Sequence, residues 1–501
     1  MRILTLTTLA LALAGALPTR AADPNPDLSQ ELKALQERVH ELERTLKVTP
    51  AKPLASGDLA QQLSALKDRV AELEKAQKAA APAGMTPEQL QDFNRITVKS
   101  EALEDWRDAA GLKGFKFSGY MDPTYVYNFA KERGTFQFLV PASSEGYGYD
   151  NSYFGTVSLD IQKETEGGTK FHVNLIPKRG TGDFNDNSIV NEASVWIPLG
   201  SLNTKLFAGQ VPDWSGYEYQ SPVQNLLITH NLLFDFTLPY FYTGAGIELV
   251  NPRLDLKLML ANFNSSIRQI GEHVPAFVFR GDYTPKGTDY WGFGFAGGFG
   301  YKANTRAFVD SGYGFDPSTG AALEADGVTP VSTKDTPFFT AEVDGWYTRG
   351  AWTVDGQVSV GTQQRAAISA NAEGRLRDAQ WWGASVLVGY KFTVRLQGIA
   401  RADFIYDQKN GGGLLDWTEV DPGNGVGPDQ EGGSPNKGAD KYALTLGLNY
   451  GFNSNVTFKA EGRLDGATER VFGNKDALAG GSNPRYHRLN SLLAGQVVFY
   501  F

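Results

Sequence analysis

Apolar and polar residues alternate with a period of two along most of the chain after residue 112. In residues 442–450, for example, every second residue is Tyr or Leu, and the residues between them are small or polar. Successive side chains of a β-strand point to opposite faces, so this repeat is typical of strands with one apolar and one polar face. The pattern predicts an all-β fold over residues 112–501.

Counting these segments gives 16 expected strands, with 14–18 as the range that shifted boundaries allow. Most segments are close to the ~9–11 residues that a tilted strand needs to cross a bilayer. The expected strands are 115–129, 152–163, 170–178, 189–198, 204–211, 240–250, 254–263, 274–284, 290–301, 338–348, 352–361, 380–390, 394–405, 439–450, 456–466 and 487–501.

The connections between these segments alternate between short and long. The short ones lie near 166–168, 199–201, 251–253, 285–287, 349–350, 391–392 and 452–454. The long ones lie near 130–151, 179–188, 212–239, 264–273, 302–337, 362–379, 406–438 and 467–486. Outer-membrane barrels have short periplasmic turns and long external loops, whereas a β-sandwich has no reason to sort its loops in this way. We therefore predict a transmembrane antiparallel β-barrel.

The composition is compatible with such a barrel. Apolar residues make up 41% of the chain, but they are scattered, and no run of 18 apolar residues follows Ala21. A membrane-spanning helix is therefore not expected. An open sheet edge in lipid would leave backbone groups unpaired, so the sheet must close. A barrel of 16 strands encloses an aqueous lumen, whereas one of about eight is filled by side chains.

Residues 1–21 have the pattern of a signal peptide. Arg2 precedes an apolar run over 3–17, and residues 19–21 offer a cleavage site between small residues. A membrane anchor is the alternative, but the run is shorter than the ~20 residues that a bilayer requires. The absence of Cys from the sequence excludes disulfides and lipid attachment to an N-terminal Cys. The net charge of −9, without a basic cluster, argues against nucleic acid as a partner.

Residues 22–84 are expected to form a periplasmic arm with two similar repeats, 27–46 and 58–76, followed by a connecting helix over 85–111. Each repeat spaces its Leu and Val residues alternately by four and three, as in the apolar seam of a coiled coil. The seam residues are Leu28, Leu32, Leu35, Val39, Leu42, Leu59, Leu63, Leu66, Val70 and Leu73. Helices this short need a partner. Either an oligomeric coiled coil or a hairpin folded back at 49–53 would supply one.

If the apolar residues face lipid, the polar residues between them face the lumen. The charged residues expected to line the pore are Lys116, Asp122, Glu342, Asp344, Asp355, Arg395, Arg401, Asp403, Lys459, Glu461 and Arg463. A partly basic wall is expected on two late strands and an acidic wall a few strands earlier. The basic wall consists of Arg395, Arg401, Lys459 and Arg463, and the acidic wall of Glu342, Asp344 and Asp355. Opposed walls of this kind would create a transverse field that orients polar solutes. The alternative is that the charges are tied up in internal pairs.

The connection 212–239 is long and unusually apolar for a water-exposed loop. We expect it either to fold inward and narrow the pore or to latch onto a neighbouring subunit. The residues expected to carry this role are Trp214, Tyr217, Glu218, Phe234 and Phe236.

Patterns that could carry other chemistry are weak. Residues 292–297 match GxGxxG, but Gly alternates with Phe there and no helix is expected to follow. Residues 183–194 begin like a calcium loop, but they lack its sixth-position Gly and its final Glu. The five His residues do not have metal-ligand spacing. We expect no catalytic residues, no metal and no cofactor.

Two stretches, 117–129 and 209–244, resemble the OmpL-like β-barrel porins of Gram-negative outer membranes. Residues 101–128 resemble an uncharacterised proteobacterial family of similar length. The arm is similar to that of some phosphate- and sugar-selective porins, which are trimers. These resemblances imply a channel of unassigned solute and a homotrimer.

The sequence thus favours a porin for passive diffusion of small polar solutes or ions across the outer membrane. The alternatives are a structural tether, whose arm reaches toward peptidoglycan from a closed barrel, and, least favoured, a barrel enzyme. The expected partners are outer-membrane lipid, lipopolysaccharide and the barrel insertion machinery, which would recognise Phe501 in the apolar last strand.

Overall fold

The computed structural model describes residues 67, 68, 70, 112–139, 154–176, 189–263, 275–303, 335–369, 371, 377–415, 417 and 419–501. The chain divides into two compact units, Met1–Lys113 and Gly114–Phe501. In the first unit, Lys67, Asp68 and Val70 are helical. The rest of the expected signal peptide, coiled-coil arm and connecting helix lies outside the described residues, and these assignments stay predictions.

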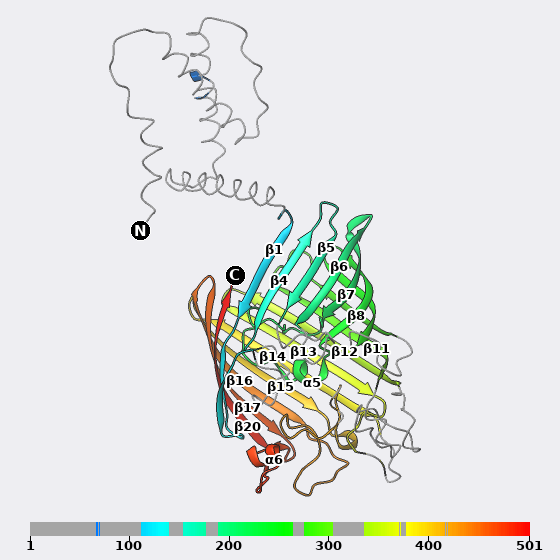
Figure 1. The fold of residues 1–501 in the computed structure, drawn as a ribbon, viewed down its shortest axis with the longest axis vertical. Coiled ribbons are helices and arrows are strands. Elements are labelled where there is room, and N and C mark those ends of the chain that lie inside the picture. Colours follow the sequence, from blue (N-terminus) through cyan, green and yellow to red (C-terminus); the bar gives the residue numbers. More distant parts are fainter. Residues whose placement is uncertain are drawn as a thin grey trace, which may run out of the picture. The chain divides into compact units, whose positions relative to one another are not determined.

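The second unit is almost entirely β-structure (Figure 1). Its main sheet consists of β1 (Phe115–Met121), β2 (Thr124–Asn128), β3 (Arg133–Gln137), β4 (Val157–Glu164), β5 (Lys170–Leu175), β6 (Val190–Leu199), β7 (Ser201–Pro212), β8 (Phe241–Val250), β9 (Leu254–Phe263), β10 (Ala276–Tyr283), β11 (Trp291–Ala303), β12 (Asp335–Arg349), β13 (Trp352–Gln363), β14 (Ala379–Lys391), β15 (Leu396–Tyr406), β16 (Lys441–Asn453), β17 (Val456–Ala467) and β20 (Leu489–Tyr500). Outside this sheet are the short pair β18 (Phe472–Gly473) and β19 (Tyr486–His487), the 3₁₀ turn η2 (Lys409–Gly411), and the helices α5 (Leu232–Thr237) and α6 (Lys475–Ala479).

The main sheet closes on itself, because the last strand, β20, pairs with β1 and β2. All of its pairings are antiparallel. Two neighbouring positions around the barrel are each filled by two strands. β1 and β2 share one position, and β4 and β3 share the next, where β4 pairs with β1 and β3 pairs with β2. The 18 strands of the sheet therefore occupy 16 positions. The predicted closed 16-strand antiparallel barrel is confirmed.

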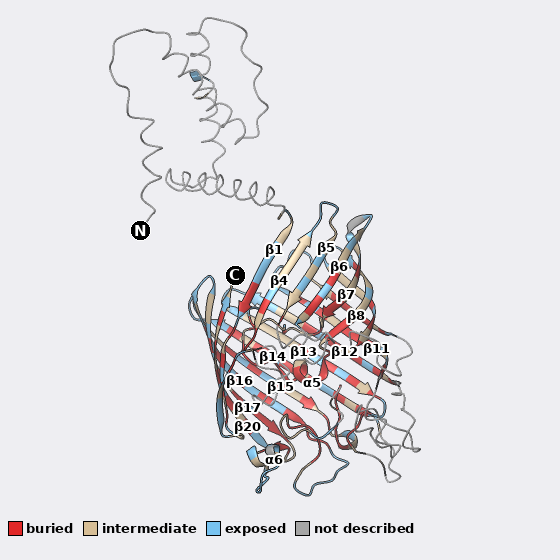
Figure 2. Cartoon of the chain, viewed as in Figure 1, coloured by how far each residue is buried: buried red, intermediate tan, exposed pale blue. Residues whose placement is uncertain are grey.

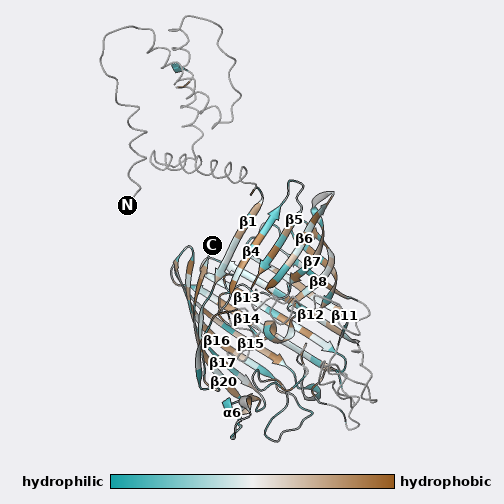
Figure 3. Cartoon of the chain, in the orientation of Figure 1, coloured by the Kyte–Doolittle hydropathy of each residue, from teal (hydrophilic) through white to brown (hydrophobic). Residues whose placement is uncertain are grey.

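Burial alternates along the strands in the sense opposite to that of a water-soluble protein (Figure 2). In β16, Leu446 is 60% exposed, whereas its neighbour Thr445 is 0% exposed. In β17, Phe458 is exposed and Lys459 is buried. The strands accordingly alternate between hydrophobic and hydrophilic residues (Figure 3). A barrel with an apolar outer face and a polar interior suits lipid outside and water within.

Aromatic rings occur on the outer face at both ends of the strands. At the end with the short turns, the rings of Trp352 and Tyr390 lie 4.7 Å apart. At the opposite end, those of Trp382 and Phe404 lie 5.3 Å apart. Rows of aromatic residues flank the apolar band of transmembrane barrels at the two membrane interfaces. The outer face of this barrel has the same arrangement.

The first long connection is not where the pattern predicted it. Instead of one loop over 130–151, a tight turn at 129–132 joins β2 to β3, and the chain leaves the wall only between β3 and β4. The cause lies in the adjacent strand, which Pro123 divides into β1 and β2, since proline has no N–H for the ladder.

Asp122 ties this break to the neighbouring position of the barrel. Its carboxylate accepts hydrogen bonds from the N–H groups of Gly155 (2.9 Å) and Thr156 (2.7 Å), where the chain returns to the wall. Gly155 has a φ of 71°, and a Cβ there would lie 2.6 Å from the Gln137 carbonyl oxygen. Only glycine fits this point of return.

The seven short turns and the remaining long connections follow the predicted alternation. Strand bounds differ from the prediction by a few residues; β15, for example, begins at Leu396, so Arg395 belongs to the turn before it. Among the described residues, no helix is both long and apolar enough to cross a membrane.

Candidate functional site

The segment between β7 and β8, residues 213–240, folds against the inner faces of β13–β17, and we call it the inner segment. Its base is closed by a hydrogen bond from the Asp213 N–H to the Tyr240 carbonyl (3.0 Å). Within it, Asn231 begins helix α5, because its side chain accepts a hydrogen bond from the Phe234 N–H (2.8 Å). This asparagine cap fixes where the segment turns.

Two arginines of the wall bind main-chain carbonyls of the inner segment. Arg401 on β15 donates to the carbonyls of Thr229 (2.6 Å) and His230 (2.8 Å), and Arg463 on β17 also donates to that of His230 (2.6 Å). Both arginine side chains are 0% exposed. Arg401 and Arg463, two of the predicted basic residues, are therefore brought together, but they bind the inner segment instead of facing open water.

Lys459 and Glu461, also on β17, extend this contact. Lys459 donates to the carbonyls of Pro222 and Asn225, both at 2.7 Å. The Glu461 carboxylate accepts a hydrogen bond from the Ile228 N–H at 2.6 Å. Lys459 thus binds carbonyl groups of the inner segment, and Glu461 binds an N–H group of the same backbone stretch.

Glu218 is the acidic partner that the inner segment itself contributes. Its carboxylate pairs with Arg401 (2.8 Å) and accepts a hydrogen bond from the Asn231 N–H (2.6 Å). Asp403 pairs with the same arginine at 3.2 Å. Burial raises the pKa of Glu218 above its ordinary value, and Arg401 opposes that rise. One arginine is therefore the shared ion-pair partner of two buried carboxylates.

Inward-facing glycines make room for the leucines of the inner segment. A Cβ on Gly383 would lie 2.4 Å from the side chain of Leu233, and one on Gly447 would lie 2.4 Å from that of Leu227. The missing side chains allow the apolar residues of the segment to pack directly on the wall, which explains its unusual composition.

The four predicted aromatic residues of this segment each make a different contact. Trp214 packs on Tyr242, Phe234 stacks on His230, and Tyr217 lies 2.6 Å from the Ser385 hydroxyl through its own hydroxyl. Phe236 is 1% exposed, and the Lys441 ammonium lies 3.4 Å from its ring centre.

The predicted acidic wall is paired as well. Arg280 on β10 donates to Glu342 (2.9 Å) and Asp344 (3.2 Å) on β12, and to Asp282 on its own strand (2.9 Å). Asp355 is half-buried and has no ion-pair partner within the described residues. Two of the three residues of the predicted acidic wall thus share one arginine as their ion-pair partner.

Three predicted pore residues lie apart from these networks. Lys116 is exposed in β1, Arg395 is exposed in the turn before β15, and Asp122 binds the break in the first strand. These placements separate Arg395 from Arg401, with which it was expected to form one basic surface.

The opposite side of the lumen is hollow. A cavity of about 510 Å³ lies between the inner segment and strands β1, β4, β5 and β6. On its wall, the two ring nitrogens of His172 lie 2.6 Å from Asp160 and 2.8 Å from Glu192. Tyr219 lines it from the inner segment. The segment therefore occupies one side of the lumen and leaves a polar space on the other.

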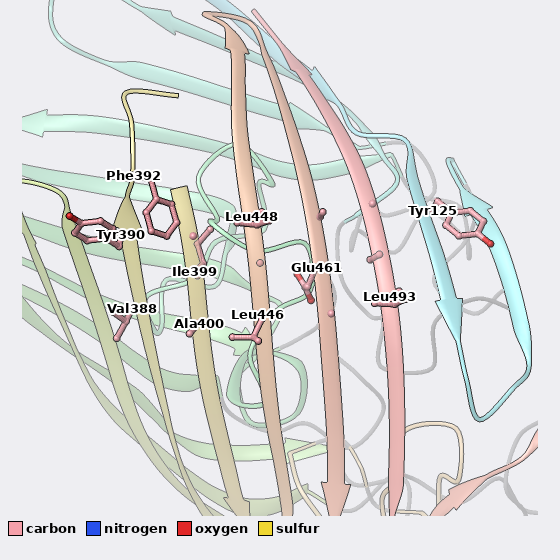
Figure 4. Close-up of a pocket in the computed structure, with 16 residues that line it drawn as sticks. Tyr125, Val388, Tyr390, Phe392, Ile399, Ala400, Leu446, Leu448, Glu461 and Leu493 are labelled. Atoms are coloured by element: carbon pink, nitrogen blue, oxygen red, sulfur yellow. The ribbon is translucent and has the colours of Figure 1, made fainter. Parts of the chain in front are cut away.

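A second hollow, of about 780 Å³, lies on the outer face over β14–β17 and β20 (Figure 4). It is lined by aliphatic side chains such as Leu446, Leu448 and Leu493, and by small residues such as Gly398 and Gly462. An apolar hollow on the lipid side offers no path to a polar solute. Within the described ranges, no group of His, Asp and Glu residues is arranged to hold a metal ion.

His230 is buried in the inner segment as a neutral ring. Burial, together with the nearby cations Arg401, Lys459 and Arg463, lowers its pKa from 6.5 to about 3. Its Nε2 lies 2.8 Å from the Tyr219 carbonyl oxygen, whereas Nδ1 has no hydrogen-bond partner among the described residues. A second proton on the ring would be buried without an acceptor.

Acid should therefore weaken the fold through His230. The unfolded chain takes up a proton below pH 6.5 that the folded chain does not, so stability is lost as the pH falls from 6.5 toward 3. The expected loss through this residue is roughly 3 kcal/mol at about pH 4. Urea midpoints from tryptophan fluorescence should fall less with pH in His230→Gln than in wild type. The exposed His487→Gln is the control, and parallel curves for wild type and His230→Gln would contradict the prediction.

Sequence reasoning missed the partners of the basic residues on the inner wall. These partners are backbone carbonyls, such as those of Thr229 and His230, and a pattern of side chains does not reveal them. It also missed Glu192, whose role depends on strand register. The polar residues Asp160, His172 and Glu192 on three successive strands were a usable signal, because adjacent strands bring inward residues together.

A family profile described as "Protein of unknown function (DUF3138)" matches residues 2–501. A comparison with curated proteins finds no match. Similar solved structures include OmpT of Vibrio cholerae (12% identity, 77% of this chain and 97% of that chain, TM-score 0.45). Salmonella typhi OmpF in complex with daunomycin has 12% identity over 77% and 97% of the chains and a TM-score of 0.46. An anion-selective porin from Comamonas acidovorans has 9% identity over 77% and 99%, with a TM-score of 0.44. The resemblance to OmpL-like porins stays a prediction.

Proposed function

Because the chain belongs to the DUF3138 family, which is described only as proteins of unknown function, we propose a function from its architecture. The protein is a porin through which small polar solutes or ions diffuse passively across the outer membrane. In this proposal the barrel contacts membrane lipid and lipopolysaccharide, the insertion machinery recognises Phe501, and the N-terminal arm lies in the periplasm.

One observation carries the proposal: the inner segment covers β13–β17 but leaves a polar cavity beside β1 and β4–β6. A barrel of 16 strands is wide enough to keep an aqueous lumen. Its charged interior and apolar exterior suit a channel through lipid. The inner segment would narrow this channel without filling it.

The test is single-channel conductance of the purified mature protein in a planar bilayer. We expect discrete current steps, in groups of three if the protein is a homotrimer. Reversal potentials in a salt gradient would then give the ion selectivity. A folded, heat-modifiable barrel that shows no steps would overturn the proposal.

A tether with a closed barrel is the second candidate, and the close docking of the inner segment favours it. Removing residues 22–110 should leave the conductance of each channel unchanged if the protein is a porin, because the barrel alone forms the path. The paired variant Leu32→Asp and Leu63→Asp keeps the arm's length and breaks its seam. If the current steps of this variant occur singly instead of in groups of three, the arm is what holds the trimer together. Loss of conductance after removal of residues 22–110 would contradict the porin function.

A further inference from the structure

A β-bulge in β6 points two consecutive polar residues into the cavity. Asn174 pairs with Glu192 and the next residue, Leu175, pairs with Val190, so Asn191 is an extra residue in its strand. A bulge re-aims side chains that would otherwise alternate between the two faces. Asn191 and Glu192 consequently both line the cavity.

The charges around this bulge leave the cavity acidic. Both ring nitrogens of His172 lie within hydrogen-bond distance of a carboxylate oxygen, one from Asp160 and one from Glu192. Both nitrogens must then donate, so the ring carries one positive charge against two negative charges. None of the described residues that line the cavity is Lys or Arg.

The donors of this cluster are used, while two of its acceptors are free. The Asn191 side-chain nitrogen donates to Gln220 (2.7 Å) and Asn174 (3.2 Å). Its oxygen has no partner among the described residues, although Asn191 is only 3% exposed. One Glu192 oxygen binds Ser194 and His172, and the other has no hydrogen bond within the same residues. A ligand that completes this site must donate hydrogen bonds.

We propose that this cavity binds a small organic cation with several N–H donors, of the alkylamine class. The proposal rests on the proposed channel function, because the solute must enter the lumen to reach the cavity. The excess negative charge selects a cation, and the orphan acceptors select one with N–H groups. Tyr219, which is 53% exposed, offers a ring on which a cation can rest. Both ring nitrogens of His172 donate hydrogen bonds, so neither has a free lone pair for a metal ion.

Three four-carbon probes of matched length separate charge from size: putrescine, butanediol and succinate. Binding to the full mature chain in detergent is measured by titration calorimetry, which does not depend on conductance. We expect putrescine to bind and the diol and the diacid to bind at least tenfold more weakly. Equal binding of the diol and the diamine would overturn the proposal.

Two variants test the acceptors in opposite directions. Glu192→Gln should weaken putrescine binding about tenfold, because it removes a charged acceptor. Asn191→Asp keeps the shape of the side chain and adds a negative charge to the cavity, so it should tighten putrescine binding. Asp289→Asn, in an exposed turn, is the matched control and should change nothing. Unchanged putrescine affinity in every cavity variant that folds would overturn the proposal, even if only one of the two variants folds.

The same preparations distinguish the two proposals. Putrescine binding without current steps would mean that the site exists and the channel does not. Current steps without putrescine binding would keep the channel and reject the site. Where both hold, putrescine should reduce the current of wild type at concentrations that leave Glu192→Gln open.

Discussion

Deleting residues 222–234 should raise the single-channel conductance by roughly twofold or more. These residues contain most of the inner segment's contacts with Lys459, Glu461 and Arg463, so their loss uncovers the wall of β15–β17. Conductance follows the open cross-section of the lumen, and this side would become water-filled. The measurement is the current step size in a planar bilayer.

A control deletion separates constriction from general damage. Residues 432–435 lie at an exposed tip of the connection between β15 and β16, and their removal should leave the step size unchanged. Replacing 222–234 by a Gly-Ser stretch of equal length keeps chain connectivity and should also raise conductance. Unaltered conductance in a folded barrel would reject constriction, and a simultaneous loss of the oligomer would identify the segment as a latch.

Replacing Arg401 by Met should destabilise the folded barrel by about 3–5 kcal/mol. The side chain is fully buried and pairs with two buried carboxylates, those of Glu218 and Asp403. Methionine fills similar space but leaves both acids without a cation. It also removes the donors to the carbonyls of Thr229 and His230, so the inner segment should loosen in the same variant.

Urea unfolding in lipid vesicles, followed by tryptophan fluorescence, measures this loss. Adding Glu218→Gln to Arg401→Met should recover part of it, because one uncompensated charge disappears. Arg470→Gln is the matched control: that arginine is 38% exposed, and a pairing with Asp429 at the surface is expected to contribute little to stability. Equal midpoints for Arg401→Met and Arg470→Gln would show that the buried network does not stabilise the barrel.

The barrel was predictable because its signals are local. A strand such as β16 has a period of two within ten residues, and its apolar set must face lipid once the sheet closes. The alternation of loop lengths then gives the direction of each strand without any knowledge of contacts. Both signals reflect the surroundings of the barrel, because the membrane and the water on its two sides impose the same pattern on every strand.

The departures from prediction arise where tertiary contacts outweigh the repeat. Pro123 was visible in the sequence, but its effect depends on Asp122 reaching Gly155 across the neighbouring position. Of the expected pore arginines, Arg401 and Arg463 lie on the inner faces of β15 and β17, where both also bind backbone carbonyls, whereas Arg395 lies in a turn. The bulge at Asn191 depends on a register shift that one sequence does not reveal.

The docking of the inner segment depends strongly on its backbone, since Arg401, Arg463 and Lys459 bind main-chain carbonyls. Carbonyls are the same in every residue, so substitutions that keep the chain's path leave these bonds intact. The side chains that face the cavity, including those of Tyr219, Ser221 and Gln224, are then free to diverge. Evolution could retune which solutes are admitted by point mutation, one cavity residue at a time, without rebuilding the attachment that holds the segment in place.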